Sequence, residues 1–300
     1  MQPGEPTADS KWRKSVSVEK TMPQASHIKI FLYTAIMLLF GLHSWAQQTV
    51  EKKVQWTNLA AGVEYAQYPF GEMQADPDIL HVVRINPRRA RLVALSRTKQ
   101  DLRKRTAQQW CEDFGFVAVI NAGMYDVDLI THVGYMKTPS TVNNKRWNKT
   151  YESVLLFDGT ASLHPPAKIM DRSDLNETIL KSFGTVIQNL RLIKNPGINV
   201  WEPQSRAWSE AAIAEDRSGN ILFLFSRKPY TMFEFNENLL HTGLNVVRAM
   251  HVEGGPEASL SLCADTKKLH LAGRSETALH DAGDEDMVQF AIPNIVGVKP

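Results

Sequence analysis

The sequence predicts an α/β protein with α+β character, in which a single domain is built on one central mixed β-sheet packed by helices. Three observations predict this fold class. Short apolar runs recur along the chain and indicate buried strands. Segments with helical periodicity separate some of these runs, as in β-α units. Asp158-Gly159 and the polar segment 216–220 lie directly between apolar runs and indicate hairpins.

The elements can be placed in order along the chain. The expected strands lie at residues 79–85, 92–96, 116–121, 154–157, 185–187, 211–214, 221–225, 246–252 and 258–262. Helical patterns fill three gaps, at about residues 106–114, 173–181 and 231–241. Thr231 is suited to cap the last helix, and Gly243 follows its end. We find no internal repeat or linker after residue 50, so we expect one domain over 79–300 and an N-terminal extension, 47–78, packing on it.

The first 46 residues have the pattern of a cleavable signal peptide. A mostly apolar run of 13 residues, 30–42, follows Lys29 and precedes Ser44-Trp45-Ala46. This run is too short to span a bilayer as a helix, and the small residues after it suit a signal peptidase. We expect cleavage after Ala46, with Met22 as an alternative start. The mature protein is then periplasmic or secreted and has no membrane segment; an uncleaved anchor is the alternative.

Charge and cysteine content narrow the function classes. Removal of residues 1–46 lowers the formal net charge from +2 to 0, because 29 basic and 29 acidic residues are left. The short basic runs 87–91 and 103–105 are typical of solvated surface, so we expect no nucleic-acid partner. The chain has two cysteines, Cys111 in an expected helix and Cys263 in an expected strand. We therefore expect two buried free thiols.

A glycine-rich acidic corner, HVEGGPEASL at residues 251–260, lies between two expected strands. It places Glu253, Gly254, Gly255 and Glu257 where one strand ends and the next begins. Glycine lets the backbone approach a ligand closely. A carboxylate at the end of a buried strand is costly unless it is paired or used. A tight polar turn is the simpler interpretation of this corner taken alone.

A second polar corner, VAVINAGMYD at residues 117–126, favours a ligand site over a simple turn. Four apolar residues predict a buried strand; Asn121 and Gly123 follow it, with Asp126 and Asp128 just beyond. Asn at a strand end is also a common turn former. Open α/β sheets bind ligands outside their strand ends. The two corners together therefore predict one shared ligand cleft.

The segments VINAGMY (119–125), VGYMK (133–137) and AMHVEGGPEASL (249–260) resemble, in order and spacing, those of the phosphodiester glycosidase family. The resemblance extends over roughly residues 80–262. The family includes the lysosomal enzyme that uncovers mannose 6-phosphate on glycoproteins, and many exported bacterial relatives. It implies an α/β domain with a central mixed sheet. It also implies hydrolysis of a sugar-1-phosphodiester to free sugar and a phosphate monoester.

The chain departs from the family pattern in two places. The family commonly carries Asp before its glycines and then a further Gly and Ser, whereas this chain has Glu253, then Pro256-Glu257, with Ser259 later. Around Glu210 the family often shows an Arg-Thr pair, and here Arg206 lies four residues earlier. These departures indicate a divergent bacterial branch with a substrate of its own; loss of activity is the alternative.

Hydrolysis of such a substrate assigns roles to the carboxylates. Glycosyl transfer to water passes through an oxocarbenium-like state that carboxylates stabilise. We expect Glu253 to stabilise or attack the anomeric carbon, or to activate water. Glu257, Asp126 or Asp128 is expected to supply the second carboxyl group or to bind a cation. Hard oxygen ligands of this kind suit Ca²⁺ or Mg²⁺, so Asp126 and Asp128 are the candidate metal ligands, and the requirement for a metal stays open.

The phosphate and the sugar need donors and positive charge. Glycine N–H groups are expected to approach the substrate, Asn121 to bind a sugar hydroxyl, and three basic residues to lie near the phosphate. The candidate substrate-binding residues are Asn121, Gly123, Gly254, Gly255, His132, Lys137, Arg206 and Ser259.

Two other functions compete with the exported hydrolase. A noncatalytic carbohydrate-binding protein of the envelope would use the same cleft, with Trp147, Tyr151, Trp201 or Trp208 stacking on sugars; these aromatic residues also suit a structural role in holding loops to the core. A phosphodiesterase that cuts the P–O bond would favour a metal ion. The partner expected in every case is a small carbohydrate or phosphosugar ligand.

Overall fold

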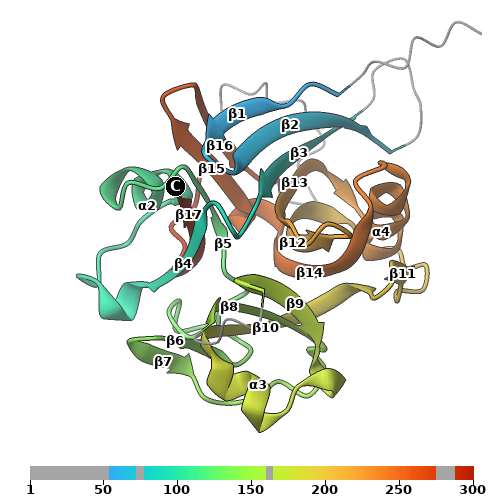
Figure 1. The fold of residues 1–300 in the computed structure, drawn as a ribbon. Coiled ribbons are helices and arrows are strands. Elements are labelled where there is room, and N and C mark those ends of the chain that lie inside the picture. Colours follow the sequence, from blue (N-terminus) through green and yellow to red (C-terminus); the bar gives the residue numbers. More distant parts are fainter. Residues whose placement is uncertain (1–53, 72–77, 160–164, 275–287) are drawn as a thin grey trace, which may run out of the picture. The chain divides into compact units, whose positions relative to one another are not determined.

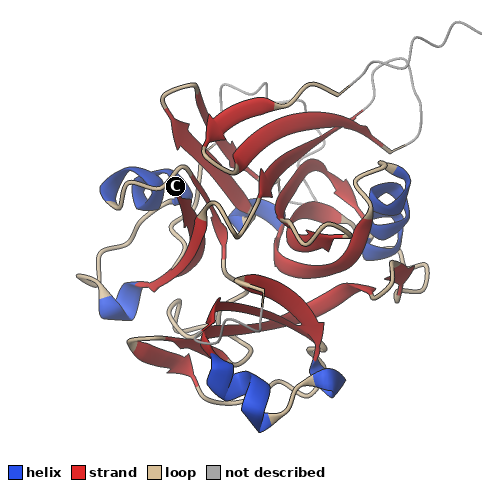
Figure 2. Cartoon of the chain, viewed as in Figure 1, coloured by secondary structure: helices blue, strands red, loops and turns tan. Residues whose placement is uncertain are grey.

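The computed structural model describes residues 54–71, 78–159, 165–274 and 288–300 (Figure 1). Strands dominate these residues (Figure 2), and every strand pairing among them is antiparallel. The strands form two sheets, and three short α-helices accompany them. The expected α/β fold with a central mixed sheet packed by helices is therefore wrong.

The larger sheet contains twelve strands. Its main path runs β1 (Thr57–Ala60), β2 (Val63–Phe70), β3 (Asp78–Ile85), β13 (Ile221–Tyr230), β12 (Trp208–Asp216), β14 (Val246–Gly254), β10 (Phe183–Lys194), β6 (Met136–Thr138) and β7 (Thr141–Asn144). Three more strands lie off this path: β8 (Ser153–Gly159) and β11 (Ile198–Asn199) pair with β10, and β9 (Ala167–Asp171) pairs with β8. The N-terminal strands β1 and β2 extend this sheet beyond β3.

The smaller sheet contains five strands, in the order β16 (Lys267–Ala272), β15 (Ser259–Ala264), β5 (Ala118–Asn121), β17 (Asn294–Lys299) and β4 (Arg91–Ser96). The helices are α2 (Ala107–Asp113), α3 (Glu177–Ser182) and α4 (Met232–His241), and the short 3-10 turns are η1 (Arg97–Lys99), η2 (Arg172–Asp174) and η3 (Gly255–Glu257). All the expected strands and helices have counterparts here. The sequence analysis missed β1, β2, β6, β7, β9, β11, β16 and β17.

The fold class was predicted wrongly because the sequence shows that a helix connects two strands, but not whether those two strands are neighbours in the sheet. α2 joins β4 to β5, and both strands pair antiparallel with β17, which lies between them. α4 joins β13 to β14, and β12 lies between those two. The strands on either side of each helix run in the same direction, as a β-α unit predicts. In both cases, however, an antiparallel strand separates them.

Alternation of side chains along the strands produces two separate cores. One face of β14 sends Met250 and Val252 into the main core, where they meet side chains of the smaller sheet such as Leu260. The opposite face carries Ala249 into a second core that α4 covers. His251 pairs with Ala212, a residue of the second core, and lies on this second face. A β-bulge at Val252 follows, and Glu253 beyond it lines the same cavity as His251.

α4 is positioned by its sequence. The Thr231 hydroxyl oxygen accepts a hydrogen bond from the Glu234 amide, and the Glu234 carboxylate accepts one from the Thr231 amide, so Thr231 is the N-terminal cap as predicted. Met232, Phe235 and Leu239 recur at helical spacing and are buried in the second core. Met232, at the start of α4, thereby lies beside the end of β14 that carries the glycine-rich corner.

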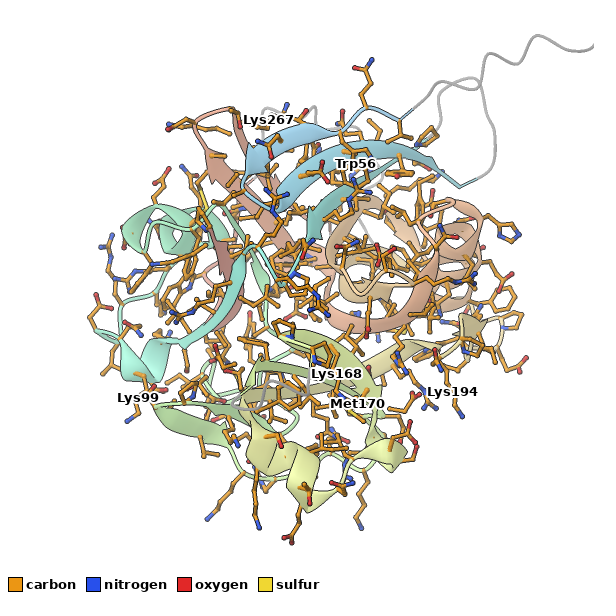
Figure 3. The ribbon with its side chains drawn as sticks, viewed as in Figure 1. Trp56, Lys99, Lys168, Met170, Lys194 and Lys267 are labelled. Carbon is orange, nitrogen blue, oxygen red and sulfur yellow. A yellow bond between two sulfur atoms is a disulfide. The ribbon has the colours of Figure 1, made fainter. Side chains whose placement is uncertain are left out.

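β8, β9 and α3 form a further packed group beside β10. Lys168 and Met170 lie on β9 (Figure 3), and Met170 packs against the small core of this group. The Ile169 amide donates to the Glu215 carboxylate of β12 at 2.8 Å, which ties β9 to the larger sheet. The hairpin turn expected at Asp158-Gly159 is wrong, because both residues lie within β8 and Phe157 pairs with Ala167, farther along the chain. Residues 160–164 lie outside the described residues.

The two cysteines are joined, contrary to the expectation of free thiols. Cys111 on α2 and Cys263 on β15 form a disulfide, with their Cα atoms 6.2 Å apart. α2 packs on the outer face of the smaller sheet, where Trp110 and Cys111 are buried beside Val119. The expectation failed because a helix and a strand distant in sequence were not known to pack together.

The N-terminal expectations cannot be compared with the structure, because the proposed signal peptide, its cleavage site and Met22 lie outside the described residues. Among the residues described, none of the helices is both long and apolar enough to cross a membrane.

Candidate active site

The two polar corners meet through hydrogen bonds from Asn121. β5 and β15 are neighbours, with Ile120 paired to Leu260, so Asn121 at the end of β5 lies beside the start of β15. Its side-chain amide donates to the Glu257 carbonyl at 3.0 Å and accepts from the Ser259 amide at 2.8 Å. Asn121 is buried, so it holds the glycine-rich corner in place through backbone groups.

A cavity of about 550 Å³ opens beside this corner. Its ionisable lining residues are Arg206, His251, Glu253 and Glu257, and Gly254 and Gly255 add backbone. Its apolar lining residues are Met124, Leu190, Trp201, Trp208, Met232 and Pro256. This volume suits a small organic ligand, and the apolar walls surround a few convergent polar groups, as ligand sites commonly do.

Glu253 is the buried carboxyl group of the cavity. It lies near the end of β14 with 9% of its surface exposed. Its pKa is raised to about 7, chiefly by burial; the charge of His251 and the Gly254 N–H lower it, and the charges of Glu257 and Glu210 add to the rise. The Gly254 N–H donates to its carboxylate at 3.2 Å. A carboxyl group that titrates near neutral pH can both accept and give up a proton under physiological conditions.

Two tyrosines complete the surroundings of Glu253. Burial raises the pKa of Tyr125 to about 12, and the charges of Glu253 and Glu257 contribute. Burial and the charge of Glu253 likewise raise the pKa of Tyr151. Both phenols therefore stay protonated near neutral pH and are potential hydrogen-bond donors in the acidic site.

His251 and Glu210 form a buried pair that the sequence analysis did not identify. The His251 Nδ1 atom lies 2.6 Å from Glu210 Oε1, and the Trp208 Nε1 group donates to Glu210 Oε2 at 2.9 Å. Burial favours the neutral imidazole, but the charge of Glu210, its hydrogen bond and the charge of Glu253 together raise the pKa of His251. The signal available for His251 was its position two residues before Glu253, although a β-bulge at Val252 interrupts the strand alternation between them.

Two other parts of the predicted site reach the cavity. Arg206 lines it from the loop before β12, with its guanidinium 5.6 Å from the centre of the Trp208 ring. Gly255 has φ of +66°, a conformation that glycine adopts readily, and it allows the chain to turn from β14 into η3. η3 carries Glu257 to the cavity wall.

Besides Asn121, four other predicted substrate-binding residues do not line the cavity, and two of these four pack together under the second corner. A Cβ at Gly123 would lie 2.2 Å from both His132 Nε2 and Asn189 Oδ1, so these side chains leave room only for glycine. His132 is buried, and its Nδ1 accepts from the Gly134 amide at 3.0 Å. Burial lowers the pKa of His132 and favours the neutral ring.

Lys137 and Ser259, the remaining two of these residues, donate hydrogen bonds to backbone carbonyl groups. The Lys137 Nζ donates to the carbonyl of Leu180 in α3 at 3.2 Å. Ser259 is buried, and its hydroxyl donates to the Glu257 carbonyl at 3.1 Å. Ser259 and Asn121 thus both support the turn that presents Glu257.

The predicted metal ligands stabilise their own loop. Asp126 and Asp128 are exposed and do not line the cavity. Asp126 accepts from the Val127 amide, and Asp128 accepts from the amide and hydroxyl of Thr131. In the described part of the chain, no group of three or more His, Cys, Asp or Glu side chains is arranged to hold a metal ion.

The candidate sugar-stacking residues separate into two groups. Trp201 and Trp208 line the cavity. Trp147 instead stacks on Tyr135, with ring centres 4.4 Å apart, and carries the Arg172 guanidinium on its ring. The aromatic surface available to a ligand is therefore provided by the first two side chains.

Comparisons with known proteins agree with this arrangement. A hypothetical protein from Synechocystis has 16% sequence identity to this chain and a TM-score of 0.54; the match covers 83% of this chain and 64% of that one. The catalytic domain of zebrafish N-acetylglucosamine-1-phosphodiester alpha-N-acetylglucosaminidase, auto-inhibited by its pro-peptide, has 10% identity and a TM-score of 0.58. That match covers 83% of this chain and 88% of the zebrafish domain. At these identities the likeness concerns the fold.

No curated protein matches the sequence. The family model of the phosphodiester glycosidases does, over residues 114–299, a range that contains both corners and the cavity. The chain therefore belongs to the phosphodiester glycosidase family.

Proposed function

We propose that this chain is an exported hydrolase that cleaves a sugar-1-phosphodiester at the glycosidic C–O bond, with Glu253 as the carboxyl group that activates water. The observation that carries the proposal is the position of Glu253, a buried carboxyl group with a pKa of about 7 in the wall of a sugar-sized cavity. Family membership supports the substrate class, a sugar joined through a phosphodiester.

The reaction divides the elements of water between two products. The bond between the anomeric carbon and the bridging oxygen breaks, and its electron pair stays with the phosphate. Glu253 accepts a proton from water, and the hydroxide oxygen bonds to the anomeric carbon. A base that titrates near the working pH is best suited to this step. Glu257 and the Gly255 backbone lie in the same wall and are available to the developing positive charge and to the sugar hydroxyls.

Export is supported by two features. The apolar segment 30–42 has the length and flanks of a signal peptide. The Cys111–Cys263 disulfide is typical of proteins that fold in an oxidising compartment such as the periplasm.

Hydrolysis in ¹⁸O-labelled water tests the proposal. We expect incubation with a sugar-1-phosphodiester to place the label in the free sugar, since the C–O bond breaks. Label in the phosphate would instead indicate P–O cleavage by a phosphodiesterase. Binding of the sugar without turnover would favour a noncatalytic carbohydrate-binding protein, a function that Trp201 and Trp208 in the cavity wall also suit.

A further inference from the structure

Both oxygens of the Glu210 carboxylate, which is buried next to the cavity, take part in hydrogen bonds. It is 2% exposed, with one oxygen bonded to His251 Nδ1 and the other to Trp208 Nε1. A carboxylate buried in this way is costly unless both oxygens find donors. The tryptophan N–H can only donate, and the 2.6 Å contact with His251 has the short length of a charge-assisted hydrogen bond.

This pairing determines how the imidazole is used. An ionised Glu210 requires the proton on Nδ1, so Nε2 is the ring nitrogen left to meet a molecule in the cavity that His251 lines. The ring is 3% exposed and cannot turn away into solvent. A carboxylate and histidine arranged in this order are a recurrent device for holding an imidazole ready to exchange a proton at Nε2.

The negative charges in the cavity, together with that of a phosphodiester, require a positively charged group that can also donate a proton. Glu253 and Glu257 both line the cavity, and a phosphodiester brings a further negative charge. Among the lining residues the basic side chains are His251 and Arg206, and Arg206 lies exposed at the rim. His251 is therefore the basic group at the buried end, beside the carboxyl group that would act on the sugar.

We propose that His251, oriented by Glu210, binds the phosphate of the substrate through Nε2–H and gives it a proton as the glycosidic bond breaks. This inference rests on the proposed hydrolase function. The electron pair of the C–O bond passes to the bridging phosphate oxygen, and the Nε2 proton moves to the phosphate, while Glu253 takes the proton of the attacking water. Afterwards solvent returns a proton to His251 and removes one from Glu253, so one water is consumed for each bond broken. Glu210 is a positioning residue, because it acts through the imidazole.

The pH dependence of this arrangement follows from its neighbours. β12 presents Glu210 and Trp208, η3 presents Glu257, the rim presents Arg206, and β10 and α4 present apolar Leu190 and Met232. Burial favours the neutral ring, but Glu210 and the charge of Glu253 raise the pKa of His251 overall. The imidazolium therefore persists above its ordinary range, and activity should be lost as the pH rises through that raised pKa.

The first experiment measures kcat and kcat/KM against pH, using a sugar-1-phosphodiester. His251→Gln should lower kcat roughly 10²-fold, as expected for the loss of a general acid. This substitution should remove the loss of activity at high pH. It should also shift the loss of activity at low pH to higher pH values, because His251 no longer lowers the pKa of Glu253. Glu210→Gln should move the high-pH decline to lower pH, since burial then acts on His251 without its carboxylate.

The matched control is Glu215→Gln, which also removes a carboxylate from β12. Glu215 interacts with Ile169 and Arg248 and is not among the cavity-lining residues, so the pH profile should stay unchanged. A high-pH decline that persists unmoved in His251→Gln and Glu210→Gln would overturn the proposal.

A second experiment needs no turnover. In protein labelled at its histidines, NMR titration with inorganic phosphate should raise the pKa of one imidazole, and His251→Gln should lack that signal. Glu210→Gln should weaken phosphate binding about tenfold. If phosphate shifts no histidine of the wild type, the inference fails even where hydrolysis is observed. If phosphate binds in this way but no sugar is released, the phosphate site stands and the proposed hydrolase function fails.

Discussion

The side-chain amide of Asn121 bonds to the backbone of Glu257 and Ser259, on both sides of Ala258, across the join between β5 and β15. One contact donates to a carbonyl and the other accepts from an amide, so a single buried side chain fixes the turn that carries Glu257. The second corner of the sequence thus serves the first as its structural support.

Replacement of Asn121 by Leu should destabilise the protein and weaken catalysis together. It leaves the buried Ser259 amide without a partner and removes one of the two hydrogen bonds to the Glu257 carbonyl, at a cost of about 2 kcal/mol in the free energy of unfolding. Urea unfolding measures the loss, and kcat should fall with it because Glu257 moves. Asn58→Ala, at an exposed position on β1, is the control and should change stability by less than about 0.5 kcal/mol. Equal stability of both variants would refute the supporting role.

Glu253→Gln should abolish the low-pH limb of the activity profile. The base must be ionised, and the pKa of Glu253 is about 7, so wild-type kcat/KM should fall as the pH drops below that value. Glutamine keeps the shape of the side chain and cannot take the proton, so kcat should fall by roughly 10²–10⁴-fold. Stopped assays across the pH range measure both effects. Wild-type turnover by a well-folded Gln variant would exclude Glu253 as the base.

The same carboxyl group should make stability depend on pH. Its pKa is about 7 in the folded protein, against an ordinary value of 4.5, so between these values the folded state binds more protons than the unfolded state. The contribution of Glu253 to stability is present below about pH 4.5 and is lost as the pH rises to about 7.

Glu253→Gln lacks this titration, so it should be more stable than the wild type at about pH 8, by on the order of 3 kcal/mol, and similar at low pH. Denaturant unfolding at both pH values provides the comparison. Parallel pH dependences of the two proteins would show that Glu253 titrates normally.

Reduction of the Cys111–Cys263 disulfide should destabilise the fold. The bond closes a loop over a sequence separation of 152 residues and fastens α2 to the smaller sheet. Its loss should cost about 2–5 kcal/mol, chiefly because the unfolded chain gains freedom. Unfolding with and without reductant measures the effect. A variant with Ser at both positions is the control: it should resemble the reduced wild type and should not respond to reductant.

Arg206 and Lys137 should differ in their effect on substrate binding. Arg206 lines the cavity, whereas Lys137 donates a hydrogen bond to the Leu180 carbonyl in α3. Arg206→Gln should raise KM about fivefold, because an exposed charge contributes roughly 1 kcal/mol to binding an anion. Lys137→Gln should leave KM within about twofold. The reverse order would mean that the phosphate lies nearer α3 than the glycine-rich corner.

Much of the local structure followed from sequence because it depends on neighbouring residues. Apolar runs predicted strands such as β13 and β14, and Thr231 predicted the start of α4. The site corner was recognisable because carboxylates and glycines at the end of a buried strand need a reason to be there. Glu253 was identified in this way, and the structure places it in a cavity wall.

The tertiary structure decided which of these elements meet. β17 lies between β4 and β5, and β12 lies between β13 and β14. The sequence predicted a mixed sheet, whereas all strand pairings among the described residues are antiparallel. Long-range pairing of this kind leaves no local periodicity, because each strand alternates in the same way whichever neighbour it has. The disulfide between α2 and β15 was hidden for the same reason.

Within the site, the sequence by itself determined which polar residues lie at the end of β14, and the tertiary structure determined what lies opposite them. His251 and Glu253 are two residues apart and line one cavity, but their chemistry depends on Glu210, 41 residues before His251. His132 was expected near the phosphate and is instead packed under Gly123. Burial and charge act through space, so the state of each ionisable group was settled only when the distant strands came together.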